Sequence, residues 1–509
     1  MSGSAATVLH LLTAGADNAT CINTPGGKPL TYGGLRALAA QTIDALNAQG
    51  VGRNDRVAIV LDNGPEMAVA FLSIAAGATA APLNPAYRTE EFEFYLSDLN
   101  AKILVIGHDK PSPALDVAQK LGIPVVRLTP TPEHGAGSFS LAFPDGRAAT
   151  RAERPGAAAV DDIALVLHTS GTTSRPKIVP LSQQNICASA GHIRNTLALS
   201  AADRGLAIMP LFHIHGLIAA LSAPLSAGGE VCCSPGFNAL KFFAWLDEVK
   251  PTWYTGVPTM HQAILLRAPG NAESVKNHRL RFIRSSSSAL PPTVIAELER
   301  VFGVPVIEAY GMTEAAHQMA SNPLNGARKP GSVGPSGGPA IRIVDDTGTT
   351  VPAGATGEIV IKGPNVMTAY ENNEKANAEA FYDGWFRTGD QGVMDEDGYV
   401  SITGRLKEII NRGGEKISPR EVDEIIMDHP AVHQCVTFAM PHDMLGEDVA
   451  AAIVLRQGIS ATEKELREFA SARLAPYKVP RKILILTEIP VGATGKLQRI
   501  GLAQKLGLV

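Results

Sequence analysis

The chain has 509 residues, of which 45% are hydrophobic and 18% are charged, and its formal net charge is −4. This length exceeds what one hydrophobic core usually organises, so we expect two or more domains. The small negative charge, without any run of Lys or Arg, argues against nucleic acid and against a membrane surface as partners. The five cysteines are scattered without metal-ligand spacing, which indicates reduced thiols.

The sequence shows no address for export or for an organelle. Its first residues lack the basic flank of a secretion signal, and its last four, Leu-Gly-Leu-Val, are not a peroxisomal signal. Apolar stretches at 67–83 and 217–233 are interrupted by Gly, Ser or Pro, so we expect buried elements and no membrane span. We therefore expect a cytoplasmic protein, either a monomer or a homodimer.

Helix and strand signals alternate over the first 400 residues or so. Apolar residues between 35 and 46 recur at helical spacing, and residues 56–61 follow as a strand. A helix at 65–76 leads into a strand at 79–82. The same rhythm predicts strands at 103–106, 124–128 and 207–209. This alternation favours an α/β fold with layers of helices and parallel strands.

The pattern changes past residue 348. Short strands and turns, such as 357–362 and 395–399, predict a β-rich subdomain that completes the large N-terminal domain. From residue 405 onward, strands alternate with helices, and 463–474 is a clear amphipathic helix. We therefore predict two domains, residues 1–404 and a small α+β cap of residues 405–509.

The loop at 167–177 carries the most informative chemistry. An apolar run at 163–167 predicts a buried strand that breaks into a turn rich in hydroxyls and ending at Lys177. Such a loop can surround a phosphate chain with O–H donors, while Gly171 lets the backbone approach and Lys177 supplies a positive charge. The hydroxyl donors are Thr169, Ser170, Thr172, Thr173 and Ser174. It is not the common P-loop, because Pro176 precedes the lysine and no Gly-Lys-Ser/Thr opens a helix.

Four further motifs follow in order: Glu-Ala-Tyr-Gly-Met-Thr-Glu at 308–314, Trp-Phe-Arg-Thr-Gly-Asp at 385–390, a Gly-Arg-Leu-Lys motif opening 404–419, and Thr-Gly-Lys within 490–499. Together with the loop, they resemble the adenylate-forming superfamily of acyl-CoA synthetases, luciferases and peptide-synthetase adenylation domains. The resemblance covers nearly the whole chain. It implies an enzyme that activates a carboxylic acid with ATP and Mg²⁺.

The resemblance also implies roles for individual residues. The Tyr310 ring would stack on adenine, Thr313 would contact phosphate and Glu314 would hold Mg²⁺. Asp390 would accept the ribose hydroxyls, and Arg405 would meet ribose or phosphates, with a structural ion pair as its alternative. Residues implied to bind the nucleotide are Thr169, Ser170, Gly171, Thr172, Thr173, Lys177, Ala309, Tyr310, Gly311, Thr313, Asp390 and Arg405.

Residues of the C-terminal domain have their own implied roles. Lys496 would enter the active site and bridge the acid's carboxylate and the α-phosphate, where it stabilises the charge that develops during displacement. Lys407 would be the hinge between two poses of this domain. In the second pose Gly413 and Gly414 would lie against the pantetheine of CoA, although a Gly-Gly turn is also an ordinary loop.

The acid itself is expected to be short and polar. Candidate pocket segments are 210–216, 281–290 and the residues after Glu314, and they hold His213, His215, Arg284, His317 and the serines at 285–288. Burying a second carboxylate is costly unless donors meet it, and these side chains are donors. A histidine at the position of His213 is widespread in the superfamily as a gate, so that residue alone does not identify the acid.

Segments 283–290, 312–323 and 410–419 resemble the oxalate–CoA ligase branch of the superfamily. The malonate branch carries Arg before the tyrosine of Tyr-Gly-Met-Thr-Glu, where this chain has Ala309, so malonate is disfavoured. The resemblance implies oxalate as substrate, held by His213, Ser287, Ser288 and His317, with Lys496, Thr172, Glu314 and His213 as the catalytic set.

Two residues depart from the superfamily pattern, Ser174 and Ile178, which stand where Gly is usual. Neither removes a charge, so ATP binding is expected to survive. Three other functions stay open: a CoA ligase for another small acid such as malonate, acetate or glycolate; an adenylation enzyme that loads a carrier protein; and a nucleotide sensor without catalysis.

Overall fold

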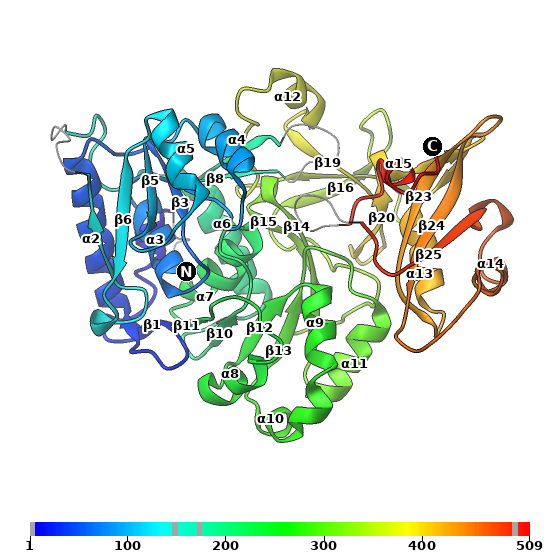
Figure 1. Ribbon diagram of the computed structural model, residues 1–509, viewed down its shortest axis with the longest axis horizontal. Helices are drawn as coiled ribbons and strands as arrows, with labels where there is room; N and C mark the ends of the chain where they lie inside the picture. Colours follow the sequence, from blue (N-terminus) through cyan, green and yellow to red (C-terminus); the bar gives the residue numbers. More distant parts are fainter. Residues whose placement is uncertain (1–5, 145–150, 170–175, 491–496) are drawn as a thin grey trace. The chain divides into compact units, whose positions relative to one another are not determined.

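The computed structural model describes residues 6–144, 151–169, 176–490 and 497–509 (Figure 1). The chain divides into two compact units, which are described one at a time. Unit 1 comprises Met1–Thr169, Lys177–Ala340 and Lys362–Asn377, and unit 2 comprises Ser170–Pro176, Ile341–Ile361 and Ala378–Val509.

A seven-stranded sheet forms the first layer of unit 1, in the order β7-β6-β5-β3-β4-β8-β9. Its inner strands are parallel, and the two edge strands, β7 and β9, are antiparallel to their neighbours. The strands are β3 Arg56–Val60, β4 Thr79–Pro82, β5 Ile103–Gly107, β6 Val125–Pro130, β7 Phe139–Ala142, β8 Ile163–His168 and β9 Ile178–Ser182. Parallel strands covered on both faces read as nearly continuous apolar runs, which β3 to β5 do.

An eight-stranded sheet forms the second layer of unit 1, in the order β15-β14-β13-β12-β10-β11-β1-β2. The six strands from β14 to β1 in this order run parallel, whereas β15 and β2 at the two edges are antiparallel. The strands are β1 Thr20–Asn23, β2 Leu30–Thr31, β10 Arg204–Ala207, β11 Glu230–Cys233, β12 Trp253–Gly256, β13 Phe282–Ser285, β14 Val306–Met312 and β15 His317–Ser321. The strand predicted at 207–209 is therefore displaced: β10 ends at Ala207.

Helices cover and separate these two sheets. Helix α3, Pro65–Ala75, is buried along almost its whole length because it contacts β4 of one sheet and β11 of the other. Helix α6, Gln183–Thr196, likewise contacts β8 and β15. Further helices of unit 1 are α1 Val8–Leu11, α2 Tyr32–Ala48, α4 Thr89–Leu99, α5 Pro113–Leu121, α7 Ala223–Leu225, α8 Phe242–Val249, α9 Pro258–Leu265, α10 Ala272–Asn277 and α11 Pro292–Phe302, with a π-helical segment at His215–Ser222.

Unit 2 contains two five-stranded sheets with no strand pairing between them in the part of the chain that the structure describes. The first has β16 Ala340–Val344, β17 Thr356–Lys362, β18 Phe381–Tyr382, β19 Trp385–Met394 and β20 Val400–Arg405, while helix α12, Glu374–Ala380, is divided between the two units. The second has β21 Ile410–Arg412, β22 Glu415–Ile417, β23 Val432–His442, β24 Gly446–Leu455 and β25 Lys482–Leu486, with helices α13 Pro419–Met427, α14 Glu463–Ser471 and α15 Leu502–Lys505.

The predicted fold class is confirmed: layered α/β sheets, a β-rich sheet and a C-terminal α+β sheet with its own apolar core. The two sheets of unit 2 meet in sequence near residue 405, but chain contacts group them together. The division into 1–404 and 405–509 therefore stays a prediction. Among the described residues, none of the helices combines the length and the apolarity that crossing a membrane requires.

Candidate functional site

The hydroxyl-rich loop joins two antiparallel strands, β8 and β9. At its base, the Thr169 N–H donates to the Lys177 carbonyl at 2.9 Å, and the Lys177 N–H donates to the Thr169 hydroxyl at 3.1 Å. The loop leads into a strand, as expected for a motif other than the common P-loop. Its tip, with Ser170, Gly171, Thr172 and Thr173, lies outside the described residues.

Lys177 and Glu314 lie on either side of one tyrosine, Tyr370. The Lys177 ammonium is 4.0 Å from the centroid of the Tyr370 ring, and the Tyr370 hydroxyl donates to Glu314 Oε1 at 2.7 Å. Burial, and then the nearby Glu314 charge, raises the pKa of Tyr370, so its hydroxyl stays a donor. The sequence analysis did not identify Tyr370, because no motif surrounds it.

Glu314 could contribute to a magnesium site together with a nucleotide. Glu314 as a whole is 7% exposed, and no cluster of three or more potential protein ligands occurs among the described residues. Mg²⁺ is commonly held by one or two carboxylates plus substrate phosphates and water. A single glutamate oxygen fits that pattern, and Mg²⁺ bound there would neutralise phosphate charge.

A strained turn places Glu314 and His317. After strand β14, the one-turn segment Thr313–Ala315 is followed by Ala316 and His317 with φ of 46° and 96°. Both lie in a region that residues other than glycine rarely adopt. A Cβ at Gly311 would overlap the His317 carbonyl oxygen, so this close approach requires glycine. Ala309 and Tyr310, also on β14, are buried.

A buried polar cluster lies where β12, β13 and β15 meet the π-helical segment. We call it the His215 cluster, and it consists of Thr255, Arg284, His215, Ser287, His317 and Gln318. The His215 and His317 rings stack at a centroid distance of 4.7 Å. His215 Nε2 lies 2.7 Å from the Thr255 hydroxyl, and His215 Nδ1 lies 2.9 Å from the Ser287 hydroxyl. These contacts connect polar side chains from β12, the π-helical segment and the turn after β13 into one set.

The charge of the His215 cluster is concentrated in Arg284. Burial lowers the pKa of this guanidinium to about 9, so it stays protonated at neutral pH. Burial lowers the pKa of His215 and His317 well below 6.5, and the proximity of His317 and Arg284 to His215 and of Arg284 to His317 lowers these pKa values further, so both rings are neutral. No carboxylate forms an ion pair with Arg284 among the described residues.

Two buried nitrogen atoms in this cluster, Arg284 Nε and His317 Nε2, lack a hydrogen-bond partner within the described ranges. Native proteins rarely leave such atoms unsatisfied, because each one costs free energy of desolvation. A buried cation with spare donors is suited to an anion.

The residues predicted to bind the acid are only partly brought together. Ser287 and His317 belong to the His215 cluster, whereas His213 is exposed and lies against Phe212 at a centroid distance of 4.6 Å. Ser288 is exposed, and its hydroxyl donates to the Ser287 carbonyl at 2.8 Å. The prediction for His213 and Ser288 stays a prediction. His215 and Arg284 were pocket candidates in the sequence, but only the structure joins them to Ser287.

In unit 2, Asp390 and Arg405 face each other across β19 and β20. Arg405 Nε lies 3.2 Å from Asp390 Oδ1, and the Asp390 N–H donates to the Thr388 hydroxyl at 3.1 Å. The Asp390 side chain is 7% exposed and that of Arg405 is 59% exposed. The ion pair that was the structural alternative for Arg405 is therefore observed, and contacts of both residues with a nucleotide stay predictions.

Gly413 and Gly414 form the two-residue turn between β21 and β22. Both have positive φ, 59° and 99°, as a type I′ hairpin turn requires. The Gly413 N–H donates to the Leu445 carbonyl at 2.9 Å, and the Gly414 N–H donates to the Asn411 side chain at 3.1 Å. The hairpin explains both glycines structurally, so CoA contact stays a prediction.

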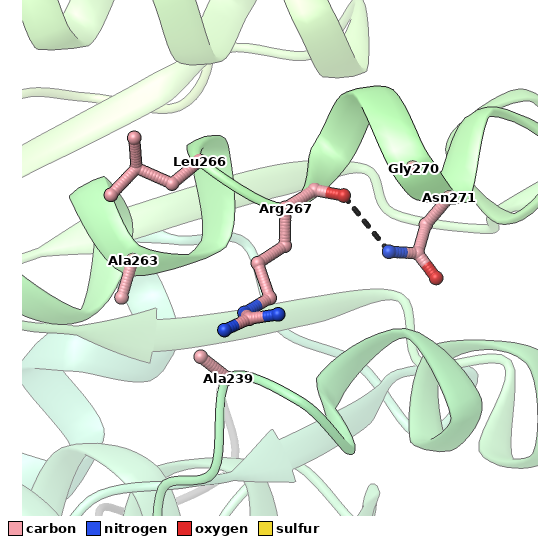
Figure 2. A pocket seen from close by; sticks show the side chains of 6 residues that line it. All are labelled: Ala239, Ala263, Leu266, Arg267, Gly270 and Asn271. Atoms are coloured by element: carbon pink, nitrogen blue, oxygen red, sulfur yellow. Dashed lines mark hydrogen bonds between the residues drawn. The ribbon is translucent and has the colours of Figure 1, made fainter.

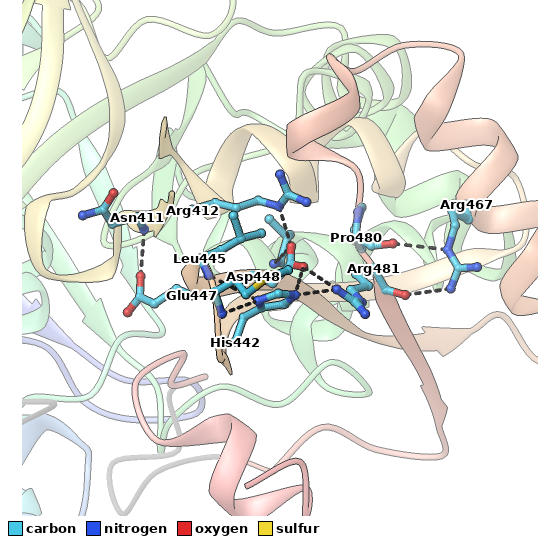
Figure 3. Close-up of polar contacts among 11 residues, drawn as sticks. Asn411, Arg412, His442, Leu445, Glu447, Asp448, Arg467, Pro480 and Arg481 are labelled. Atoms are coloured by element: carbon cyan, nitrogen blue, oxygen red, sulfur yellow. Dashed lines mark hydrogen bonds and ion pairs between the residues drawn. The ribbon is translucent and has the colours of Figure 1, made fainter. Parts of the chain in front are cut away.

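Neighbouring side chains fix this hairpin to β24 (Figure 3). Arg412 Nε donates to the buried Asp448 carboxylate at 2.7 Å, and Arg481 lies 3.5 Å from its other oxygen. The Asn411 N–H donates to Glu447 at 2.7 Å. We call Arg412, Asp448 and Arg481 the Asp448 cluster.

An ion-pair network in unit 2 joins the segment of the predicted hinge to the segment around Arg499. Lys407 lies in the one-turn segment Leu406–Glu408, and Glu408 pairs with Arg499 at 3.1 Å. Arg499 also pairs with buried Asp423 at 2.7 Å. Lys496 lies outside the described residues, three positions before Arg499. Arg499 therefore anchors the segment that follows the lysine, a role that its surface-like sequence context did not indicate.

A hollow of about 620 Å³ opens on the surface of unit 1, away from the residues discussed above (Figure 2). The Arg267 side chain extends toward Ala239, and the Arg267 carbonyl accepts from the Asn271 side chain at 2.8 Å. None of the predicted site residues lines it.

Comparisons with known proteins agree with the motif order. A family model described as "AMP-binding enzyme" matches residues 13–371, and one described as "AMP-binding enzyme C-terminal domain" matches residues 421–496. The chain is 45% identical to a probable CoA ligase, CCL9, of Humulus lupulus, with 92% of this chain and 90% of the relative covered. It is 42% identical to the oxalate–CoA ligase of Arabidopsis thaliana, with 95% of each covered.

The fold is similarly shared with solved structures. The crystal structure of ATP-bound MatB from Rhodopseudomonas palustris matches with a TM-score of 0.88 and 31% identity, over 98% of each chain. The similarity therefore extends over both units of the chain and includes a structure determined with ATP.

Proposed function

We propose that this chain, which belongs to the AMP-binding enzyme family and is an AMP-forming acyl-CoA ligase, takes oxalate as its acid. In the first step, an oxalate oxygen attacks the α-phosphorus of ATP and the bond to pyrophosphate breaks. In the second, the CoA thiolate attacks the acyl carbon and AMP leaves with the bonding electron pair. The products are oxalyl-CoA, AMP and pyrophosphate. Division into two steps gives each displacement a good leaving group.

The observation that supports oxalate is the excess positive charge of the His215 cluster. Arg284 is fully buried without a carboxylate partner among the described residues, and Ser287 and His317 are polar groups beside it. A long aliphatic acid would gain nothing from a buried cation. A short acid with a second carboxylate would replace lost hydration with charge-assisted hydrogen bonds.

Each substrate has a proposed set of contacts. Lys177 and the hydroxyl-rich loop would hold the phosphates, and Glu314 would hold Mg²⁺. The Tyr370 hydroxyl, which donates to Glu314, would orient that carboxylate. Residues proposed to hold the nucleotide are Thr169, Ser170, Gly171, Thr172, Thr173, Lys177, Ala309, Tyr310, Gly311, Thr313, Asp390 and Arg405. Residues proposed to hold the acid are Ser287, His317, His213 and Ser288.

The C-terminal domain, proposed as residues 405–509, would act in both steps. Lys496 would neutralise the two anions that meet in the first step. Rotation near Lys407 would then bring the Gly413–Gly414 turn toward CoA. The ion pair between Glu408 and Arg499 would couple the hinge segment to the segment that carries Lys496.

A panel of small acids tests the proposal. Oxalate, malonate, acetate and glycolate would each be assayed for pyrophosphate release and CoA consumption, with the thioester identified by mass. We expect oxalate to give the highest kcat/KM. A higher value for malonate or a monocarboxylate would overturn oxalate as substrate. Acylation of a carrier protein without CoA consumption would favour the loading function, and no pyrophosphate release with any acid would favour a nucleotide sensor.

A second short dianion, malonate, is the alternative that the same cluster favours. The cluster would favour an acid with a second negative charge, and both oxalate and malonate have one. Against malonate, Ala309 stands where the malonate branch would carry arginine. The panel above separates these two acids directly.

A further inference from the structure

We propose that Arg284, Thr255, His215 and Ser287 form a hydrogen-bond relay in which every member donates in one direction, ending at the Ser287 hydroxyl. The relay leaves that hydroxyl as a donor for the second carboxylate of the acid. Arg284 and Thr255 are then positioning residues for acid selectivity, since they act through His215 and Ser287. The link to a dicarboxylate rests on the proposed function, whereas the direction of the relay does not.

Arg284 is the first donor of the relay, because a guanidinium has donors and no acceptor. Arg284 Nη1 lies 3.3 Å from the Thr255 hydroxyl oxygen and 3.4 Å from His215 Nε2. Because Arg284 Nη1 can only donate, His215 Nε2 is an acceptor and carries no hydrogen. The Thr255 hydroxyl, 2.7 Å from this nitrogen, must then donate to it.

The tautomer of His215 follows from this. Its ring is neutral in its buried position, so a ring without hydrogen on Nε2 must carry it on Nδ1. Nδ1 then donates to the Ser287 hydroxyl oxygen at 2.9 Å. Ser287 accepts within the relay, and its own O–H hydrogen is not used by any member.

The relay runs from a buried cation to an exposed hydroxyl. Arg284, Thr255 and His215 are each at most 2% exposed, whereas Ser287 is exposed and has a strained φ of 73°. Hydrogen bonds in a chain polarise one another, and the effect is larger where water is excluded. The terminal hydroxyl is thus a stronger donor to an anion than an isolated serine would be.

The groups around His215 preserve this direction. His317 from β15, His261 from α9, His213 and Arg284 face His215, and each disfavours its protonation. No carboxylate is among these neighbours. The other arm of Arg284 donates to Gln318 at 3.3 Å, and the Gln318 amide donates in turn to Thr196 and to the Gly337 carbonyl. Gln318 is thereby held with its oxygen toward Arg284.

Thr255 variants test the relay in activity. Thr255→Val keeps the shape and removes the hydroxyl, so we expect the KM for the acid to rise roughly three- to tenfold while the KM for ATP stays unchanged. Thr255→Ser restores a hydroxyl and should restore the KM. Thr42→Val, which removes another buried threonine hydroxyl in helix α2, is the matched control for a general packing defect. Equal KM values for Thr255→Val and wild type would overturn the relay.

The ¹⁵N chemical shifts of His215 test the relay without any acid or turnover. In the wild-type protein, with assignment from a His215→Gln variant, we expect a neutral ring protonated on Nδ1 and unprotonated on Nε2. A ring protonated on Nε2, or an imidazolium, would overturn the inference. If wild type prefers a different acid, oxalate as substrate fails while this tautomer stands, so the two failures are distinguishable. The spectrum also decides the question if Thr255→Val does not fold.

Discussion

Two buried charged clusters, one in each unit, solve the same electrostatic problem in opposite ways. In the Asp448 cluster of unit 2, a carboxylate that is 1% exposed is met by Arg412 at 2.7 Å and by Arg481 at 3.5 Å. In the His215 cluster of unit 1, the fully buried Arg284 is surrounded by neutral hydroxyl, imidazole and amide groups. The buried charge of the first cluster is paired with opposite charges of the chain, and the buried charge of the second cluster is not.

The difference separates structural charge from charge reserved for a ligand. Burying an ion without a partner costs several kcal/mol, by the order of magnitude known for proteins, and a fold does not need to bear it. The arginine side chains of the Asp448 cluster are 30% and 61% exposed, so solvent shares their charge. Arg284 has no such access, which is why we interpret it as part of an anion site.

The largest expected effect is on catalysis, and it tests whether unit 2 contributes a catalytic residue. Lys496→Ala should lower pyrophosphate release roughly a hundredfold or more, because it removes the cation that stabilises charge in the displacement. ATP affinity, measured by titration calorimetry, should stay broadly intact. Nearly unchanged pyrophosphate release would remove Lys496 from catalysis.

The next effect tests the unbalanced cluster directly. Arg284→Met should lower kcat/KM for oxalate roughly ten- to a hundredfold, which is the range for losing a charge-assisted hydrogen bond. Its thermal midpoint should not fall, because the change removes a buried ion that has no carboxylate partner. Reduced stability with unchanged kcat/KM would reverse the interpretation and make Arg284 a structural residue.

His317→Ala should separate acid binding from nucleotide binding within the same cluster. The ring stacks on His215, and its Nε2 lacks a hydrogen-bond partner within the described ranges. We expect oxalate turnover to fall more than ATP affinity does. A parallel loss of both, measured by kinetics and by ATP titration, would indicate misfolding.

A substitution in the Asp448 cluster should change the stability of the protein and leave its activity unchanged. Asp448→Asn should lower the free energy of unfolding by about 1–2 kcal/mol, since the hydrogen bond from Arg412 weakens and the ion pair with Arg481 is lost. Glu447→Gln, on the same strand and less buried, is the control and should change it by less than about 0.5 kcal/mol. Urea unfolding measures both, and activity per folded molecule should be retained in pyrophosphate release.

The two clusters should also lose stability at different pH. His215 and His317 have folded pKa values well below 6.5, so below about pH 6.5 the unfolded chain binds more protons and the free energy of unfolding falls. The pKa of Asp448 is lowered from 3.8 by its arginine contacts, against the effect of burial, so its contribution is present above that value and is lost as pH falls below it.

Urea unfolding from about pH 7.5 down to about pH 3 would resolve these two declines. Arg284→Met should reduce the decline that comes from the histidines. Burial is the main cause of the low pKa values of His215 and His317, and Arg284 is a further cause. Asp448→Asn should remove the part of the second that comes from Asp448. Identical pH profiles for wild type and both variants would contradict the electrostatic account of the clusters.

The smallest expected effect concerns the hairpin that the Asp448 cluster supports. Gly414→Ala and Gly458→Ala both place a methyl group in open space at a positive φ, 99° and 78°, so each should destabilise by about 1 kcal/mol. If the hairpin approaches CoA, only Gly414→Ala should also slow thioester formation while leaving pyrophosphate release unchanged. Equal thioester rates for the two variants would remove this turn from CoA contact.

Much of the fold follows from sequence periodicity, and the exceptions have physical causes. Strands β3, β4 and β5 are short apolar runs bounded by turns, and they lie close to where the pattern predicts them. The strand predicted at 207–209 is displaced to Arg204–Ala207, because the apolar residues after it, Ile208 and Met209, are buried without strand pairing. The two sheets of unit 2 are grouped by packing contacts such as those of α13 with β20, which strand and helix periodicity does not predict.

The candidate site was predictable where it follows motifs and hidden where it depends on packing. Thr169, Lys177 and Glu314 were candidates from their motifs, and the structure places Lys177 and Glu314 against Tyr370, which has no motif. In the His-x-His segment the sequence favoured His213, but His215 is the ring that turns inward to Ser287 and Arg284. One residue separates the two histidines in the chain, and only the path of the backbone decides which of them is buried.

A crystal structure with a non-hydrolysable oxalyl-adenylate analogue tests the central claim most directly. The account predicts that the second carboxylate of the oxalyl group lies within hydrogen-bonding distance of the Ser287 hydroxyl and of His317 Nε2, beside the Arg284 charge. An analogue bound with that carboxylate facing solvent or other residues, and with the His215 cluster unchanged, would contradict it.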